Sequence, residues 1–122
     1  MISDVILSTS NLSSAERFYD GFLALFGAKK TIQNDSRILW KCRNENVGLI
    51  LCKKNNQLTS QKMCSLTVAL HADSPAEVRM IYQVALRLGA TCAGEPMVSD
   101  VGEHEAYFWD ADQNKFGIFY HQ

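Results

Sequence analysis

The sequence has no long hydrophobic run, no cluster of basic residues and none of the common nucleotide-binding or hydrolase motifs. Its apolar stretches are far shorter than the roughly 20 residues that cross a bilayer as a helix, so no membrane span is expected. The chain has 12 basic and 13 acidic side chains without a basic patch, which argues against nucleic-acid binding. Because GxGxxG, P-loop and GxSxG patterns are missing, no motif indicates dinucleotide, nucleoside triphosphate or serine-hydrolase chemistry.

The cysteines do not form a recognisable metal or redox motif. Cys42, Cys52, Cys64 and Cys92 include no CxxC pair and have no close histidine partner. Cys42 and Cys52 lie within apolar, strand-like patterns, where buried free thiols are the favoured interpretation. No signal peptide is recognised before the first strand pattern, so together with the cysteine usage a cytoplasmic location is expected.

What the sequence does contain is the composition of one small globular domain with an internal repeat. At 122 residues, with 47% hydrophobic and 20% charged residues, the chain has room for one ordinary domain or two very small ones. In the first half, Ile2–Thr9 alternates like a strand, and Ser13 with Glu16 forms a capping-box pattern before an apolar stripe at helical spacing. Gly27 closes this predicted helix. Two apolar runs, 37–43 and 47–53, then predict a hairpin across Asn44-Glu45-Asn46, and 55–62 is interpreted as a linker.

The second half repeats this order. Ser65–His71 alternates as a strand, and Ser74-Pro75-Ala76-Glu77 is a second capping box with proline at the first helical position. Gly89 ends the helix that follows. The remaining predicted elements are a short strand at about 90–93 and a hairpin of 104–109 with 115–121 across the turn 110–114. A strand, a capped helix, a glycine and further strands thus occur twice, in repeats of about 1–58 and 63–122 within a single domain, 1–122.

Two stretches go beyond this general pattern. The opening, Asp4-Val5-Ile6-Leu7 through Phe18-Tyr19 to Leu25-Phe26-Gly27, resembles the first strand and helix of the vicinal oxygen chelate superfamily, which includes glyoxalase I, bleomycin-resistance proteins and extradiol dioxygenases. The close, Tyr107 through Asp110-Ala111-Asp112-Gln113-Asn114 to Gly117, is similar to that superfamily's terminal Asp-Pro-Asp-Gly-Asn hairpin. The resemblance implies an α+β fold of two βαβββ repeats that form a curved mixed sheet around a pocket.

The resemblance also implies three places for metal ligands, and the sequence departs from the pattern at each of them. Asp4 stands where the first histidine is expected, Thr67 where the second is expected, and Gly117 where a glutamate is expected. One carboxylate of three donors is insufficient for a hard divalent cation, so we expect no metal and no cofactor. A site rebuilt with Asp4 and other residues remains the alternative, although His71 and His121 lie four residues from the superfamily positions, roughly 13 Å along a strand.

We therefore interpret the pocket as an aromatic one. Strand alternation brings His71, Glu105, Tyr107, Phe119 and His121 to the face shared by positions 4, 67 and 117. The predicted ligand contacts are the side chains of Asp4, Trp40, Thr67, Glu105, Tyr107 and Phe119. Core packing is a competing interpretation for the aromatic residues. No catalytic residue is assigned.

The predicted function is metal-independent binding of a small organic ligand, similar in kind to that of the bleomycin-resistance proteins. The alternatives are a metal-dependent enzyme (a glyoxalase-like lyase, an isomerase or a dioxygenase) with a rebuilt site, or a structural dimer whose pocket is filled. Uncovered sheet edges, together with the habit of the superfamily, predict a homodimer.

Overall fold

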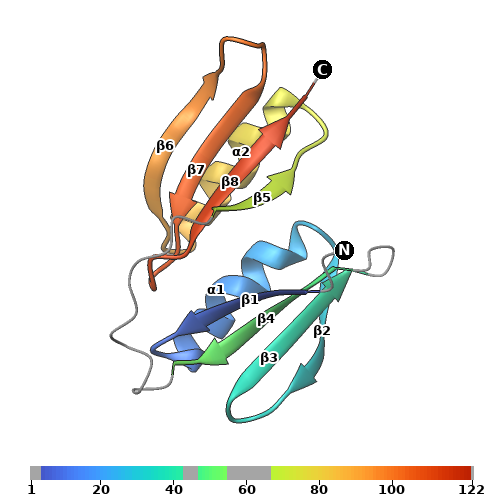
Figure 1. Ribbon diagram of the computed structural model, residues 1–122, viewed down its shortest axis with the longest axis vertical. Coiled ribbons are helices and arrows are strands. Elements are labelled where there is room, and N and C mark those ends of the chain that lie inside the picture. The colour runs from blue at the N-terminus through green and yellow to red at the C-terminus, as the bar shows by residue number, and fades with distance from the viewer. Residues whose placement is uncertain (1–3, 43–46, 55–66, 122) are drawn as a thin grey trace. The chain divides into compact units, whose positions relative to one another are not determined.

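Each half of the chain folds into one strand, one helix and three further strands. The computed structural model describes residues 4–42, 47–54 and 67–121 (Figure 1). The elements are β1 (Asp4–Thr9), α1 (Leu12–Ala24), β2 (Ala28–Gln33), β3 (Arg37–Cys42), β4 (Gly48–Lys53), β5 (Thr67–His71), α2 (Pro75–Arg87), β6 (Thr91–Val98), β7 (His104–Trp109) and β8 (Lys115–Tyr120). The chain divides into two compact units, Met1–Met63 and Cys64–Gln122. The predicted α+β fold of two βαβββ repeats is confirmed.

The two units contain sheets of the same topology. The strand order is β1-β4-β3-β2 in the first unit and β5-β8-β7-β6 in the second. In each sheet the strand before the helix pairs in parallel with the last strand, and the other pairs are antiparallel. Both sheets are open, and one helix covers one face of each. At 13 residues, neither of these helices is long enough to cross a membrane, and the described residues include no other candidate span.

The two helix starts show where the capping predictions hold. In α2 the Ser74 hydroxyl accepts the Glu77 N–H at 3.0 Å, while the Glu77 carboxylate accepts the Asp73 N–H at 2.8 Å, so the predicted capping box is confirmed. In α1 the cap is Asn11, whose side-chain oxygen accepts the Ser14 N–H at 3.1 Å. The predicted cap at Ser13 is therefore wrong by two residues, because Asn11 satisfies the first free amides of the helix.

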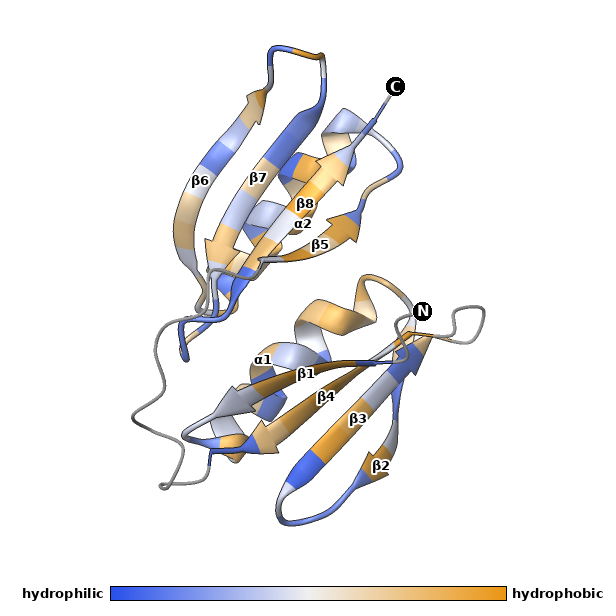
Figure 2. Cartoon of the chain, in the orientation of Figure 1, coloured by the Kyte–Doolittle hydropathy of each residue, from blue (hydrophilic) through white to orange (hydrophobic). Residues whose placement is uncertain are grey.

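The core of the first unit lies between α1 and its sheet. Tyr19 and Phe22 of α1 are 1% and 0% exposed, and they face a sheet surface that contributes Ile38 and Leu51, also at most 1% exposed. Figure 2 shows hydrophobic residues concentrated along β1, β3 and β4. Val5 pairs with Leu49 and Leu7 with Leu51, which places both on the helix side of β1, as predicted.

The core of the second unit is formed by α2, β7 and β8. Phe108 and Phe116 are fully buried and stacked, with ring centroids 5.1 Å apart and planes 7° from parallel. Val78 and Ile81 of α2 are equally buried. Val68 pairs with Phe116 and Leu70 with Ile118, so both lie on the helix side of β5. Leu66 is outside the described residues.

The terminal hairpin turns on the carboxylate of Asp110. One oxygen accepts the backbone N–H groups of Asp112 at 2.9 Å and Asn114 at 2.8 Å, and the other accepts the Asn114 amide at 2.8 Å. Asp110 is only 4% exposed. The Asp110 carboxylate therefore stabilises the turn predicted over 110–114.

Two strands differ from the predictions. β2 was not predicted, because five of its six residues are exposed and give no apolar alternation. β6 extends to Val98 rather than ending near Ala93, with two irregularities in its register along β7. The predicted turn 44–46 and linker 55–62 lie outside the described residues.

Candidate functional site

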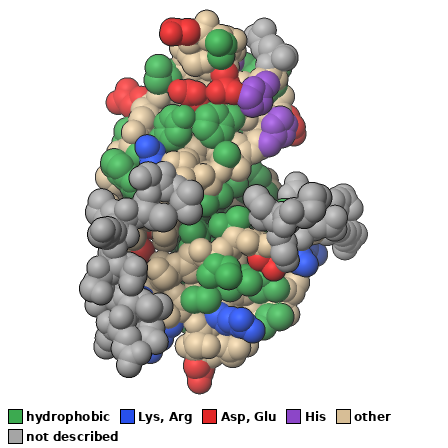
Figure 3. Space-filling view, in the orientation of Figure 1, with side chains coloured by type: hydrophobic (Ala, Val, Ile, Leu, Met, Phe, Trp, Pro, Cys, Tyr) green, Lys and Arg blue, Asp and Glu red, His purple; other side chains and the backbone are tan. Residues whose placement is uncertain are grey.

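The face of the second sheet that points away from α2 carries most of the predicted ligand contacts. We call it the helix-distal face. It consists of Thr67, Ala69 and His71 of β5, Glu105, Tyr107 and Trp109 of β7, and Lys115, Gly117 and Phe119 of β8, as the strand register shows. Two cross-strand rows bring the predicted residues together: His71–Phe119–Glu105 and Ala69–Gly117–Tyr107. In Figure 3, hydrophobic side chains of the second unit lie beside acidic side chains and histidines.

Gly117 is the centre of this face, and two aromatic rings occupy the space that its missing side chain leaves. A Cβ atom placed on Gly117 would lie 2.7 Å from Cε2 of Phe119 and 2.9 Å from Cε1 of Tyr107. The two rings meet edge to face, with centroids 5.6 Å apart and planes at 85°. A carboxylate side chain at position 117 would have to displace both rings. The rings of Tyr107 and Phe119 therefore cover Gly117, and we call this pair of rings the aromatic floor.

A second glycine supports the same ring from the other side. A Cβ atom on Gly94 of β6 would lie 3.1 Å from Cδ2 of Tyr107, with which Gly94 is paired across the strands. The Tyr107 ring thus lies across the sheet between Gly94 and Gly117, a cross-strand arrangement in which an aromatic ring covers glycine. Sequence reasoning did not include Gly94, although a glycine within a strand often marks a close approach of this kind.

Acidic groups border the aromatic floor. Glu105 pairs with Phe119 across the strands, and Glu103 lies two residues before it. Burial raises the pKa of Glu105 above its usual 4.5, and the negative charge of Glu103 and a hydrogen bond with that carboxyl raise it further. The Nδ1 atom of His121 lies 2.7 Å from an Oε atom of Glu103. The carboxyl groups of Glu103 and Glu105 thus lie close together despite their mutual repulsion.

Tyr107 has a cation on its ring and carboxylates near its hydroxyl. The Lys115 ammonium lies 5.0 Å from the ring centroid, within cation–π range. Burial raises the pKa of the Tyr107 phenol, and the charges of Glu105 and Glu103 raise it further. Tyr107 therefore stays a neutral hydrogen-bonding group near physiological pH. Sequence reasoning did not find Lys115, because nothing in the spacing indicates that its side chain bends over a ring on the next strand.

Trp40 does not lie on a helix-distal sheet face. It is 2% exposed, its ring lies 5.8 Å from that of Tyr19, and its Nε1–H donates to Asp20 of α1 at 3.0 Å. The burial of Trp40 against α1 gives no support to the predicted ligand contact. Its side chain lies on the helix side of β3, where it belongs to the core of the first unit.

The other predicted residues have polar partners or open surroundings. The Asp4 carboxylate accepts the Gly48 N–H at 3.0 Å, which ties it to the neighbouring strand. The Thr67 side chain is exposed at the start of β5. His71 Nε2 lies 3.1 Å from a carboxylate oxygen of Asp73, so each strand-end histidine has a carboxylate partner, which for His121 is Glu103.

The donor set does not fit the divalent metal of the superfamily. Position 117 has no side chain and is covered by rings, and Thr67 offers only a neutral hydroxyl. Among residues 4–42, 47–54 and 67–121, no three His, Cys, Asp or Glu side chains gather as a metal-binding group. No chemical step through a metal is therefore derived.

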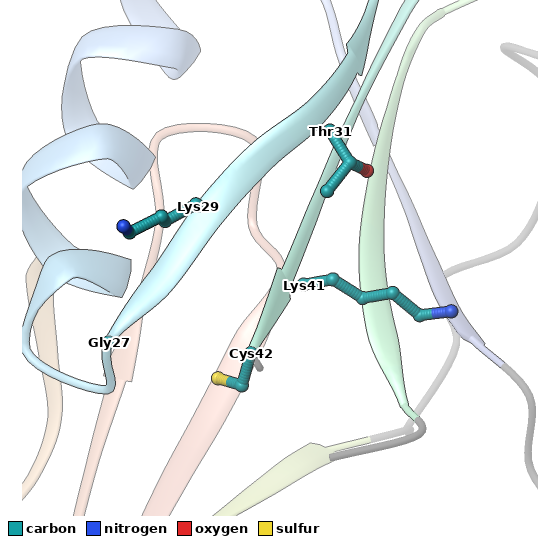
Figure 4. A pocket seen from close by; sticks show the side chains of 5 residues that line it. All are labelled: Gly27, Lys29, Thr31, Lys41 and Cys42. Carbon is teal, nitrogen blue, oxygen red and sulfur yellow. The ribbon is translucent and has the colours of Figure 1, made fainter. Parts of the chain in front are cut away.

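A hollow in the first unit lacks the features of a ligand site. It has a volume of about 490 Å³ and is lined by Gly27, Lys29, Thr31, Lys41 and Cys42. Figure 4 shows the Lys29 and Lys41 side chains pointing in opposite directions. A small-molecule site needs polar groups that converge, and these two amines do not.

Comparison with known proteins identifies the fold. A glyoxalase/bleomycin resistance protein from Albidiferax ferrireducens T118 superimposes with a TM-score of 0.82 at 22% identity, covering 100% of this chain and 99% of the other. A glyoxalase/bleomycin resistance protein/dioxygenase family enzyme from Burkholderia phytofirmans PsJN gives 0.82 at 17% identity, covering 97% and 96%. The fosfomycin resistance protein FosX from Mesorhizobium loti gives 0.75 at 13% identity, covering 100% and 92%.

The sequence itself matches no protein-family model and no curated protein. The likeness to the solved structures confirms the predicted resemblance at the level of the fold: the chain has the fold of these glyoxalase/bleomycin resistance/dioxygenase proteins.

Proposed function

We propose that this protein binds a small organic molecule without a metal, on the helix-distal face of its second sheet. The observation that supports the proposal is the aromatic floor over Gly117, where the rings of Tyr107 and Phe119 stand in the place of a ligating carboxylate. Both rings are only partly buried, so each keeps a surface for a ligand. Aromatic surface with a few polar groups at its border is typical of small-molecule sites.

Four residues of this face have separate roles in the proposal. Tyr107 and Phe119 provide apolar contact area, and the neutral Tyr107 hydroxyl provides a directional hydrogen bond. Glu105 provides a charged or protonated carboxyl at the border, and Thr67 a hydroxyl at the end of β5. Ligand contact by Asp4 stays a separate prediction, since its carboxylate already accepts the Gly48 N–H.

Location and assembly complete the proposal. We expect a cytoplasmic protein that forms a homodimer, because β1, β2, β5 and β6 are the outer strands of the two sheets formed by the described residues, and outer strands are commonly covered by association. The charge is distributed unevenly: residues 1–63 contain nine basic and five acidic side chains, and residues 64–122 contain three and eight. Halves of net charge +4 and −5 are compatible with a symmetric homodimer in which the positive half of each copy contacts the negative half of the other.

A metal analysis combined with a ligand screen tests the proposal. The protein is purified without chelators, its metal content is measured, and a metabolite library is screened by thermal shift with and without EDTA. We expect substoichiometric metal and a stabilising compound whose effect survives EDTA and is lost in Tyr107→Ala. Trp40→Phe, a change in the first-unit core, is the control and should retain the shift.

Two results would contradict the proposal. Stoichiometric zinc, nickel, iron or manganese that is lost in Asp4→Asn would instead favour the metal-dependent enzyme with a rebuilt site. A screen without any hit that depends on Tyr107 would favour a structural dimer.

A further inference from the structure

The second unit has a strong excess of negative charge. Of its three basic side chains, Arg79 and Arg87 belong to α2, and only Lys115 is on the described strands. Its eight acidic side chains include Glu103 and Glu105 at the aromatic floor. Within the second unit, the helix-distal face therefore has carboxylates beside the aromatic rings and a single strand lysine.

Glu103 and Glu105 form a pair that a positive charge would stabilise. They are close enough to share a hydrogen bond, and the charge of Glu103 makes ionisation of Glu105 more costly. Besides each other, the titratable groups near this pair are His121, which contacts Glu103, and Tyr107, whose phenol the two carboxylates influence. His71 is the third member of the row formed with Phe119 and Glu105, but it contacts Asp73.

The aromatic floor already accommodates a cation. The ammonium of Lys115 lies 5.0 Å from the Tyr107 ring centroid, which shows that a positive group can reach the ring. The Lys115 amine makes no ion pair with the described residues 67–121, so rotation of this side chain would break no salt bridge there. A ligand cation can therefore take the place of the lysine on the ring.

From these observations, and resting on the proposed function, we infer that the helix-distal face binds an organic cation. Its apolar or aromatic body lies against Tyr107 and Phe119, and its protonated amine or quaternary ammonium lies towards Glu103 and Glu105. An anionic ligand would meet two carboxylates and a single lysine, so the face discriminates against it.

Three probes with the same phenyl ring and different charge test the inference: benzylamine, benzyl alcohol and phenylacetate. Binding is followed by amide chemical shifts in NMR titrations of the full chain, near neutral pH and at low salt. We expect shifts on β7 and β8, with benzylamine binding at least about threefold more tightly than benzyl alcohol and phenylacetate binding most weakly.

Three variants sharpen the test, because two of them have opposite expected effects. Glu105→Gln removes an attractive charge and should weaken benzylamine binding about threefold. Lys115→Gln removes the competing cation and should strengthen it by a similar factor. Glu95→Gln is the matched control: it removes one negative charge from β6 on the side of Tyr82, which belongs to α2, and should leave the affinity unchanged. Thermal unfolding of each variant verifies that it is folded.

The outcomes separate this inference from the proposed function. If benzyl alcohol or phenylacetate binds as tightly as benzylamine, or if Lys115→Gln weakens benzylamine binding, the cation inference is wrong while ligand binding on this face stands. Benzylamine without any shift on β7 and β8 also overturns the inference. The proposed function fails by a different result, a metabolite screen without a Tyr107-dependent hit.

Discussion

Replacing Tyr107 and, separately, Phe108 by alanine compares two neighbouring aromatic residues whose side chains lie on opposite faces of β7. Phe108 is fully buried and stacked on Phe116, so its loss leaves a cavity and should lower the free energy of unfolding by about 3–5 kcal/mol. Tyr107 is half-buried. Its loss removes the edge-to-face contact with Phe119, about 0.5–1.5 kcal/mol, and the exposed contact with Lys115, about 0.5–1 kcal/mol. Burial of about half of the ring adds roughly 1 kcal/mol, so Tyr107→Ala should lower the free energy of unfolding by about 2–3.5 kcal/mol, less than Phe108→Ala.

Urea unfolding followed by circular dichroism measures both losses, and similar slopes against urea concentration verify that the variants unfold like the parent. Amide hydrogen exchange along β7 and β8 assigns the losses to the second unit. If Phe108→Ala does not fold, the large loss expected for it is supported. Tyr107→Ala must fold in either case. Should Tyr107→Ala lose as much stability as Phe108→Ala, Tyr107 would be a core residue and the proposed ligand floor would be wrong.

Further predictions concern the glycine, the carboxyl pair, the helix cap and the assembly. Gly117→Ala should displace the rings above it, seen as altered ring proton shifts of Tyr107, and should abolish ligand binding that depends on the aromatic floor; unchanged ring shifts would contradict the contact distances. The raised pKa of Glu105 means that the folded protein holds this proton more tightly than the unfolded chain. The contribution of Glu105 to the free energy of unfolding should therefore fall as pH rises from about 4.5 through its folded-state pKa. Glu105→Gln should accordingly be more stable than the parent above this pH range and equal to it below. Ser74→Ala removes the N-cap of α2 and should lower the free energy of unfolding by about 1 kcal/mol, measured by urea unfolding. In sedimentation experiments the homodimer should weaken as salt is raised, because its halves carry opposite net charge; association that is insensitive to salt would contradict this.

Local patterns in the sequence were sufficient to predict the repeat and most of its elements. The α2 capping box, the alternation along β5 and β7 and the turn around Asp110 depend on neighbours within a few residues, and the structure shows each of them. The expectation that the usual metal donors are missing also needed only the residue types at positions 67 and 117. β2 was missed because its residues are nearly all exposed, so its existence depends on pairing with β3 rather than on a pattern of its own.

The side on which each aromatic residue lies was decided by tertiary packing. Ile38 and Trp40 alternate with Leu39 along β3, so both faces of this strand carry apolar residues and alternation alone did not tell which face the helix covers. The contact of Trp40 with Asp20 of α1 settles it. At position 117 the sequence shows that a side chain is missing, but not what fills the space. Two rings fill it, one from the same strand and one from the strand beside it, because strand pairing brings Tyr107 and Phe119 to the same point of the sheet.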